Sequence, residues 1–594
     1  MNYLAKEKFY FGIIAGAKEV MQNRAYLNEI NVYPVPDGDT GSNLYAMMQN
    51  IINHPPTNHN IDITLETISE SAIIGAKGNS GLLFAQYIDA FIEEILRNEM
   101  ISSKAFLKAC QMGMNAAYNA IEKPIEGTIL TIMRVFYEAL KPYETHEAFF
   151  EEPLEIAKHA LVKAVDDTTH QLMALKRASV VDSGAKGFLY FITGFIRGIA
   201  LNSVDTKVIP LQIPEAIELH HFTDETLTFR YCFEVLLKKN EETQASIGKH
   251  FQDDGDSVIV TQTKHYFRMH MHTNFPSRVF QKAMAFGYVE KQKVDDMLMQ
   301  YTQAHHRKYK TAIVTDSVSD IHDQWLLEKE VSIIPLSILS EEGLFLDKRT
   351  INNDILFRHI EKTGKLPTSS QPDRSLISNQ LEQVLTHYDQ VMVLTVSSAL
   401  SGTYSSIKKV ADDLFDRTRK RITVIDTKQN SAAQGLLVWY LAKLRDDNEP
   451  YDVMAEKIQA AISRTKIIVR IAQIDHMIWS GRLNIYAGRI AKVLRIKPLI
   501  TLDAAGQGSI QKLCFNRRGA ERAFLDHILK THKEKTILYY ALTYVDDPGM
   551  AEAVALDIKQ LIGLDPVYIV ESSSVIALGA GKGAIAIGYM TKEM

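Results

Sequence analysis

The sequence predicts a multidomain protein with an all-α N-terminal part, a small α/β middle part and a larger α/β C-terminal part. The chain has 594 residues, which is too long for a single hydrophobic core. Apolar residues recur at helical spacing through most of residues 1–200, whereas short apolar strands alternate with helices in residues 311–594. We therefore expect domains at residues 1–203, 204–308 and 309–594.

Composition narrows the class of protein. Apolar residues make up 46% of the chain and charged residues 23%, and the formal net charge is −5, which gives no electrostatic reason to expect nucleic acid. The three cysteines are far apart and odd in number, which suits a reducing compartment. The N-terminus leads into an amphipathic helix rather than a signal segment, and no run approaches the roughly 18–20 apolar residues that span a bilayer. We expect a soluble, cytoplasmic protein with at most peripheral membrane contact.

The first 200 residues are predicted to be helical. The expected helices are residues 10–27, 44–52, 82–96, 105–120, 129–140, 153–170 and 188–200. Four helices begin with glycine beside small polar residues, at Thr40-Gly41-Ser42-Asn43, Gly78-Asn79-Ser80-Gly81, Gly127-Thr128 and Asp182-Ser183-Gly184-Ala185-Lys186-Gly187. If the helices alternate up and down, these starts gather at one pole, where their N–H groups and positive dipole ends suit a polyphosphate.

Two carboxylates precede the first of these helix starts. Asp37 and Asp39 lie in a Gly/Pro-rich turn and could share a Mg²⁺ ion, which takes oxygen ligands. Taken alone, the turn is more commonly a solvated Asp-Gly turn, and each helix start is more commonly an ordinary cap. No Walker-type phosphate loop occurs in the sequence.

These four motifs in order resemble the ATP-binding DhaL-type domain of dihydroxyacetone kinases, and the Pro34-Val35-Pro36 lead-in resembles its bacterial fatty acid kinase branch. The resemblance implies an eight-helix barrel with ATP and two Mg²⁺ at one end, where Asp37 and Asp39 are the catalytic, metal-holding residues. Dihydroxyacetone kinases have a third Asp upstream, and Asn31 is the nearest polar candidate here. The implied nucleotide contacts are Thr40, Gly41, Ser42, Asn43, Gly78, Asn79, Ser80, Gly81, Gly127, Thr128, Asp182, Gly184 and Gly187.

The middle part is predicted to contain strands at residues 228–237, 257–261 and 266–272. His270 and His272 alternate on one strand and so point to one face, and with Cys232 they could form a Zn²⁺ site. The alternative is a pair of polar residues on the solvent face and a buried cysteine. The segments around these residues resemble the middle domain of fatty acid kinases, in which such a Cys and His pair has been implicated in metal binding. Residues 304–310, which include His305 and His306, are expected to be a linker.

The C-terminal part alternates strands with helices. Strands are expected at residues 311–316, 331–339, 390–396, 421–425, 467–471, 536–542 and 566–570, and helices at 354–363, 375–385, 405–414 and 451–465. This order favours parallel α/β architecture, with ligands beyond the carboxyl ends of the strands. Loops 366–372 and 397–404 are rich in hydroxyl groups that could hold a carboxylate or another anion, or could simply cap helices.

Thr315-Asp316-Ser317 and the segments 474–482 and 495–498 resemble the DegV family. The resemblance implies a two-lobed protein that buries a fatty acyl chain. The implied substrate-binding residues are Thr368, Ser369, Ser401, Gly402, Gly579 and Lys582, with Ser369 and Ser401 holding the carboxylate. The C-terminal loop departs from the family pattern, because Gly579 replaces a histidine and Lys582 a proline. Either Lys582 is an alternative positive partner, or the head group has changed, or the phosphoryl-acceptor function has been lost.

Together the resemblances imply a fatty acid kinase with a fused acyl-binding part, which uses ATP and Mg²⁺ to convert a long-chain fatty acid to an acyl phosphate. A homodimer and a downstream acyltransferase are the expected partners. The alternatives are a lipid-binding or lipid-sensing protein with a weak or inactive kinase domain, and a dihydroxyacetone (glycerone) kinase-like enzyme. The last is disfavoured because nothing in the sequence resembles the separate dihydroxyacetone-binding domain.

Overall fold

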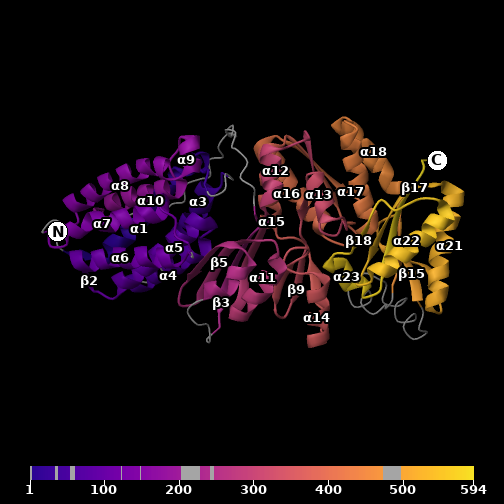
Figure 1. Ribbon diagram of the computed structural model, residues 1–594, viewed down its shortest axis with the longest axis horizontal. Helices are drawn as coiled ribbons and strands as arrows, with labels where there is room; N and C mark the ends of the chain where they lie inside the picture. Colours follow the sequence, from indigo (N-terminus) through magenta and orange to yellow (C-terminus); the bar gives the residue numbers. More distant parts are fainter. Residues whose placement is uncertain are drawn as a thin grey trace. The chain divides into compact units, whose positions relative to one another are not determined.

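The chain forms two compact units, Met1–Gln300 and Tyr301–Met594. The computed structural model, drawn in Figure 1, describes residues 3–33, 38–53, 60–121, 123–146, 149–201, 228–240, 247–471 and 497–593. The first unit therefore contains the predicted all-α part and all but the last eight residues of the predicted middle part, 204–308.

Helices dominate the start of the first unit, as predicted. They are α1 (Lys6–Gln22), α2 (Arg24–Glu29), α3 (Thr40–Ile52), α4 (Ile61–Gly75), α5 (Gly78–Leu96), α6 (Ser103–Asn119), α7 (Ile129–Leu140), α8 (Glu152–Gln171), α9 (Met173–Ala178) and α10 (Ser183–Ile199). The predicted helix at 10–27 is two helices that meet at Asn23. The sequence did not indicate α4, whose many β-branched residues have modest helix propensity. It also missed a short antiparallel pair, β1 (Tyr3–Ala5) and β2 (Met100–Ser102).

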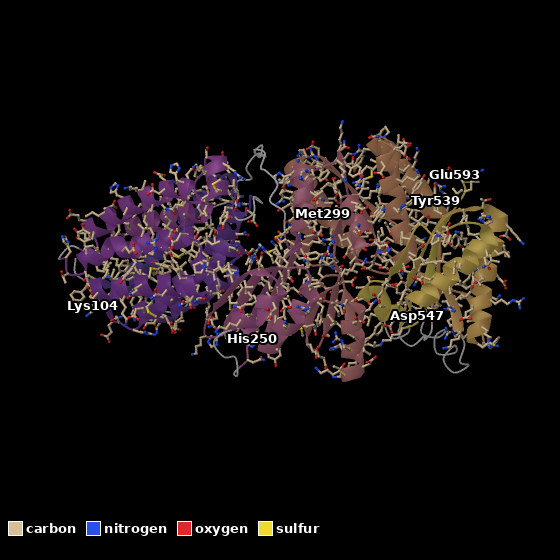
Figure 2. The ribbon with its side chains drawn as sticks, in the orientation of Figure 1. Lys104, His250, Met299, Tyr539, Asp547 and Glu593 are labelled. Atoms are coloured by element: carbon tan, nitrogen blue, oxygen red, sulfur yellow. The ribbon has the colours of Figure 1, made fainter. Side chains whose placement is uncertain are left out.

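The longer helices pack in a closed succession. Contacts run from α1 to α3 and α4, on through α5, α6, α7 and α8 to α10, and from α10 back to α1. The interior is aromatic: the rings of Phe9, Phe91, Phe106 and Phe195 lie within 6.4 Å of one another, centroid to centroid. Figure 2 shows the side chains that fill the space between these helices. The eight-helix barrel itself stays a prediction.

Helices α1 and α10 touch backbone to backbone. A Cβ atom added at Gly194 would lie 2.5 Å from the carbonyl oxygen of Ala15, and one added at Gly198 would lie 2.5 Å from that of Phe11. On the facing helix, a Cβ at Gly16 would lie 2.7 Å from the carbonyl oxygen of Phe191. Only glycine permits so close an approach.

The middle of the chain forms a four-stranded antiparallel sheet in the order β4-β5-β3-β6. Its strands are β3 (Tyr231–Lys239), β4 (Asp256–Gln262), β5 (Tyr266–Thr273) and β6 (Gly287–Asp296), and α11 (Pro276–Ala283) follows β5. The three predicted strands are confirmed. The sequence did not predict β6, because its many charged residues obscure the alternation of apolar and polar side chains that is typical of a strand.

The sheet packs on the helices of the first unit. The Val260 N–H donates to the Ala120 carbonyl oxygen at 2.9 Å, and the Gln262 N–H donates to Gln86 Oε1 at 2.9 Å. Leu236 and Ile259 belong to the same hydrophobic core as the helices. Because sheet and helices share a core, the positions of their side chains are fixed relative to each other.

The described residues of the second unit form three sheets. A parallel sheet has the order β13-β12-β7-β8, a six-stranded sheet has the order β16-β15-β14-β19-β17-β18, and a small antiparallel sheet has the order β10-β9-β11. The strands are β7 (Thr311–Asp316), β8 (Val331–Ile334), β9 (Ser337–Ser340), β10 (Gly343–Leu346), β11 (Thr368–Ser370), β12 (Gln390–Thr395), β13 (Arg421–Asp426), β14 (Thr465–Arg470), β15 (Lys497–Leu502), β16 (Gly508–Cys514), β17 (Ile537–Tyr544), β18 (Ile569–Glu571) and β19 (Ile585–Thr591).

The expectation of a parallel architecture holds for the first of these sheets only. In the six-stranded sheet β17 and β18 run parallel, while every other neighbouring pair is antiparallel. The predicted strand at 331–339 is divided between β8 and β9, which belong to different sheets. Short apolar runs look alike in parallel and antiparallel sheets, so the sequence pattern did not distinguish them.

The helices of the second unit are α12 (Met297–His305, which begins in the first unit), α13 (Asp323–Glu328), α14 (Asn353–Thr363), α15 (Arg374–His387), α16 (Thr403–Thr418), α17 (Ser431–Asp446), α18 (Tyr451–Arg464), α21 (Arg517–Lys535), α22 (Pro548–Ile562) and α23 (Ser574–Ala580). His305 ends α12, so the predicted linker begins later than expected. Among the helices that the structure describes, none combines the length and the apolar character needed to cross a membrane.

Candidate functional site

Four helix N-termini of the first unit converge. The Asn43 amide at the start of α3 lies against Gly78 at the start of α5, where an added Cβ would be 2.8 Å from Asn43 Nδ2. Gly184 at the start of α10 lies against Ser80, where an added Cβ would be 2.5 Å from the Ser80 hydroxyl oxygen. The Asp182 carboxylate accepts N–H groups from its own helix and from Ile129, the first residue of α7. The predicted gathering of the glycine-rich helix starts is thus present.

Asp39 lies at this convergence, directly before α3. Its Oδ1 accepts a hydrogen bond from Asn43 Nδ2 at 2.8 Å. The buried Asn31 uses its Oδ1 to accept the Thr40 N–H at 2.9 Å, so it stands beside the same turn. Asp37, the other predicted catalytic and metal-holding residue, lies outside the described residues. Asp39 and Asn31 therefore place oxygen atoms at the pole where the helix starts meet.

The remaining predicted nucleotide contacts divide into two groups. Among the described residues, Asn79 Oδ1 is buried without a hydrogen-bond partner, which fits a ligand at this point. The Ser42 hydroxyl instead accepts hydrogen bonds from Arg24 and Asn28, and the Thr128 hydroxyl donates to the Ile125 carbonyl. Gly127, with φ +85°, allows the turn that precedes α7.

Asp182 is a buried carboxyl at the centre of this arrangement. Burial raises its pKa to about 7, against the opposing effect of the N–H groups of Ala185, Gly184 and Ile129. It bridges the starts of α7 and α10, and so it fixes the spacing between two of the four helix ends.

The predicted metal ligands are brought together by the register of the middle sheet. Cys232 on β3 lies directly opposite His272 on β5, and His270 is opposite Glu234. One ligand atom from each of Cys232, His270 and His272 lies within 4.8 Å of the others. This is one thiol and two imidazoles, a donor set that suits Zn²⁺.

Hydrogen bonds around the histidines also fit a metal. His270 Nδ1 lies 3.3 Å from Glu234 Oε1, and His272 Nδ1 lies 3.2 Å from Asp256 Oδ1. Within the described part of the chain, the buried His270 Nε2 has no hydrogen-bond partner. His270 Nδ1 also lies 3.6 Å from Cys232 Sγ, so this nitrogen faces both the thiol and the Glu234 carboxylate. Metal-bound histidines commonly pass their other ring N–H to a carboxylate, and Asp256 is placed to accept it from His272. Burial lowers the pKa of His270, which favours the neutral imidazole that binds metals.

Two further residues of the same sheet face were not among the predicted site residues. Glu234 and Arg268 are buried, with 4% and 6% of their surfaces exposed, and Arg268 Nη2 donates to Glu234 Oε2 at 3.2 Å. Burial alone would raise the pKa of Glu234, but the His270 hydrogen bond and the charges of Arg268 and Lys293 hold it well below its usual range. Both residues lie two positions from a metal ligand along a strand, and this alternation was the signal that could have found them.

The second unit contains an apolar cavity. The space that the centre of a water-sized sphere can occupy in it is about 80 Å³. Aliphatic side chains line most of it, among them Leu400, Ile467, Val469, Ile500, Val575 and Ile585. Ser431, Thr543 and Ser572 add hydroxyl groups to the lining. The cavity suits an alkyl chain with a polar end.

The predicted substrate-binding residues lie in different places. Among the described residues, the cavity lining includes Gly579 but not Thr368, Ser369, Ser401, Gly402 or Lys582. Thr368 and Ser369 are in β11, Ser401 Oγ lies 2.8 Å from Thr403 Oγ1, and Gly402 caps α16. Lys582 Nζ lies 3.1 Å from Glu361 Oε1 and 3.7 Å from Asp546 Oδ2. Its ammonium group is thus paired with two carboxylates.

A network of buried acids lies next to the cavity. Asp320 accepts hydrogen bonds from the hydroxyl of the cavity-lining Ser431 and from the Ser573 N–H, and Asp347 accepts from the Ser317 hydroxyl and the Ser574 N–H. These bonds join the loops after β7 and β10 to the start of α23. Burial raises the pKa of Asp316 and of Asp347 to about 6.

This network predicts an unusual pH dependence. The folded pKa of Asp347, about 6, is above its unfolded value of 3.8, so its contribution to stability is present at low pH and is lost as the pH rises through about 6. Between pH 7.5 and 5 the gain is roughly 1.4 kcal/mol for one such carboxyl. Asp316, whose pKa is raised to the same value, adds a similar gain, so we expect urea unfolding of Asp347→Asn to show a smaller gain than the wild type by about this amount. An equal pH dependence in both proteins would contradict the assignment.

Family models match three consecutive segments of the chain. They are described as a DAK2 domain at residues 34–197, a FakA-like middle domain of fatty acid kinases at residues 228–304, and the uncharacterised DegV family at residues 310–592. The three predicted parts are each matched by the family to which the sequence motifs pointed.

Curated relatives include uncharacterized proteins of Staphylococcus aureus strains bovine RF122 / ET3-1 and MRSA252. Each is 32% identical over 314 residues, which are 50% of this chain and 57% of the relative. The chain thus spans little more than half the length of these relatives.

Similar solved structures include a fatty acid-binding DegV family protein from Thermus thermophilus (21% identity, TM-score 0.44) and the fatty acid kinase B3 protein of Streptococcus pneumoniae loaded with linoleic acid (18% identity, TM-score 0.42). Each match covers 48% of this chain and 100% of the other.

Proposed function

We propose that this chain, which carries a DAK2 domain, a FakA-like middle domain and a DegV-family domain, is an ATP- and Mg²⁺-dependent fatty acid kinase with a fused acyl-binding part. The observation that carries the proposal is the convergence of four helix N-termini around Asp39, beside the amide oxygen of Asn79, which has no hydrogen-bond partner in the described part of the chain. Such a pole favours a polyphosphate, and the apolar cavity of the second unit favours an alkyl chain.

The proposed reaction is a single phosphoryl transfer. A carboxylate oxygen of the fatty acid forms a bond to the γ-phosphorus of ATP as the bond to the β–γ bridging oxygen breaks, which gives an acyl phosphate and ADP with no net proton change. The helix N–H groups hold the phosphates, and the predicted residues Asp37 and Asp39, with Asn31 beside them, would hold Mg²⁺. Bound Mg²⁺ neutralises phosphate charge, and the rest of the catalysis is positioning.

The second unit would present the acyl chain. Leaving the chain in water costs about 0.8 kcal/mol per CH₂ group, so an aliphatic cavity is the expected solution. Ser369 and Ser401 stay our candidates for the carboxylate, alongside the cavity hydroxyls of Ser431 and Thr543. Because an acyl phosphate is a reactive mixed anhydride, an acyltransferase is the class of enzyme that would consume it. A homodimer stays the expected assembly.

The central test is ADP release from MgATP with and without oleate or palmitate, with acyl phosphate identified by mass spectrometry. We expect the fatty acid to raise ADP release by about tenfold or more, because it is the acceptor that replaces water. Ala586→Phe, which fills the cavity wall, should remove this stimulation and leave nucleotide binding intact. Leu556→Phe, at a side chain 62% exposed, is the matched control. Stimulation by dihydroxyacetone and not by fatty acid would overturn the proposal.

A lipid-binding or lipid-sensing protein with an inactive kinase is the second candidate. The observation that favours it is the end of α23 and the loop that follows, where Gly579 in the helix has no side chain and Lys582 in the loop is paired with Glu361 and Asp546. Mass spectrometry of the purified protein for bound lipid, together with a MgATP titration, separates the two functions. Bound lipid without MgATP binding would establish the sensor, and binding of neither would exclude both.

A further inference from the structure

We propose that Glu234 and Arg268, two buried residues of the middle sheet, position the loop between α4 and α5 and couple metal binding at Cys232, His270 and His272 to nucleotide affinity. The inference rests on the proposed function in one respect, which is that the start of α5 contacts the nucleotide. It assigns to this sheet a role in the nucleotide site that goes beyond holding a metal.

The two side chains hold opposite ends of the same turn. Arg268 Nη1 donates to the carbonyl oxygens of Ile73 and Ile74, at 3.2 and 2.9 Å, where α4 ends. Glu234 Oε1 accepts the N–H of Gly78 at 2.9 Å, where α5 begins. The last carbonyls and the first N–H groups of a helix lack partners within the helix, and a cation and an anion are the partners that suit them.

Glu234 and Arg268 are linked to each other. Arg268 and Glu234 hydrogen-bond to each other as well as to the helices, and both side chains are buried. A shift of either strand therefore moves both ends of the loop that begins α5. Gly78 has φ +62°, a conformation that a well-placed acceptor for its N–H helps to hold. The next residues, Asn79 and Ser80, are those that we assign to the nucleotide.

The metal cluster meets the loop at a single atom. Glu234 Oε1, which accepts the Gly78 N–H, is also 3.3 Å from His270 Nδ1. Cys232 Sγ lies 3.6 Å from the same Nδ1, so this nitrogen faces both the thiol and Glu234. A metal held by Cys232 Sγ and His270 Nδ1 would occupy this nitrogen, and Glu234 Oε1 would then accept from Gly78 alone. Without metal, Nδ1 can carry a proton and donate to Glu234 in competition with the Gly78 N–H.

Such a connection must act in both directions. If zinc strengthens nucleotide binding by some factor, the nucleotide strengthens zinc binding by the same factor, and coupling of this kind is typically about 5- to 150-fold. The coupling depends on the Glu234 carboxylate. Because its Oε1 contacts both the Gly78 N–H and His270 Nδ1, a change at the histidine alters the hydrogen bond to Gly78.

The test measures MgADP affinity by calorimetry in zinc-loaded and chelator-stripped full-length protein, with zinc content checked by mass spectrometry. In the wild type we expect stripping to weaken MgADP binding by about tenfold. In Glu234→Gln the affinities with and without zinc should agree within about twofold, since the neutral amide weakens the link to His270. Glu290→Gln, an exposed change on β6 of the same sheet, should keep the wild-type ratio.

Arg268→Lys is the second variant, and it keeps the positive charge beside Glu234 while it removes the forked contact to the two carbonyls. It should weaken MgADP binding in both zinc states with an unchanged zinc content. Thermal unfolding confirms that each variant is folded. A merely structural role for Glu234 would lower stability and leave the ratio between zinc states unchanged.

The outcomes separate this inference from the proposed function. MgADP binding that is equal in the two zinc states of the wild type, or a wild type that takes up no zinc, would overturn the coupling and leave the kinase proposal in place. A wild type that binds no MgADP in either state would overturn both.

Discussion

Asp39→Asn is expected to lower ADP release by about 100-fold or more, because a metal at a phosphate centre contributes several kcal/mol and each 1.36 kcal/mol is tenfold in rate. The substitution is nearly isosteric. It keeps an oxygen that can accept from Asn43 Nδ2, so the start of α3 should be preserved. What it removes is the negative charge that would hold Mg²⁺ at the converging helix ends. The measurement is ADP release as a function of Mg²⁺ concentration, beside MgATP affinity.

Asp166→Asn, at an exposed carboxylate on α8, is the control and should leave turnover and Mg²⁺ dependence unchanged. We expect Asp37→Asn to behave like Asp39→Asn. Wild-type Mg²⁺ dependence in Asp39→Asn would show that the metal is held elsewhere and would remove Asp39 from the catalytic assignment.

Gly194→Val is expected to destabilise the first unit by about 3 kcal/mol, the upper range for an overpacked core. Even the Cβ atom of the new side chain would lie 2.5 Å from the Ala15 carbonyl oxygen and 2.8 Å from Gly16 Cα. These are backbone atoms, which a rotamer change cannot move aside. Helix α1 would have to shift away from α10, and the helix starts near it would shift as well. Hydrogen exchange of α1 and α10 in the full chain measures the effect.

Gly549→Ala on α22 is the control for the helical position. An added Cβ there meets its nearest neighbour, Asp547 Oδ1, at 3.8 Å, which is an ordinary contact. Alanine favours a helix over glycine by about 1 kcal/mol, so this variant should be neutral or slightly more stable. If Gly194→Val retained wild-type protection in both helices, the close packing of α1 on α10 would be disproved.

Local patterns predicted the candidate sites better than they predicted the architecture around them. Glycine with small polar residues marked four helix starts, and strand alternation put His270 and His272 on one face, because both patterns depend on near neighbours in the chain. The pairing of Cys232 with His272 depends on strand register, which a hydrophobic pattern alone fixes only in part. Glu234 and Arg268 were missed because polar residues in a strand are usually assigned to its solvent face.

The acid network of the second unit could not be predicted from the sequence for a related reason. Asp320 and Ser573 are 253 positions apart, and Asp347 and Ser574 are 227 apart. The sequence showed Asp316 as a polar residue at the end of a strand. The residues near it in the chain gave no sign that the N–H groups of Ser573 and Ser574 would donate to Asp320 and Asp347. Parallel and antiparallel strands were confused for the same reason, since the direction of pairing is set by the connections and not by the strands.

The contact of α1 with α10 also has a consequence during synthesis. Helix α1 ends at Gln22 and its partner α10 ends at Ile199, so ribosomes working at about 5–20 residues per second need roughly 10–35 s to supply the second helix after the first. Until then the face of α1 that carries Gly12 and Gly16 has no partner, whereas Phe9 can already pack on Phe91 and Phe106. Helix α1 therefore reaches its final packing only after about 180 further residues have been made.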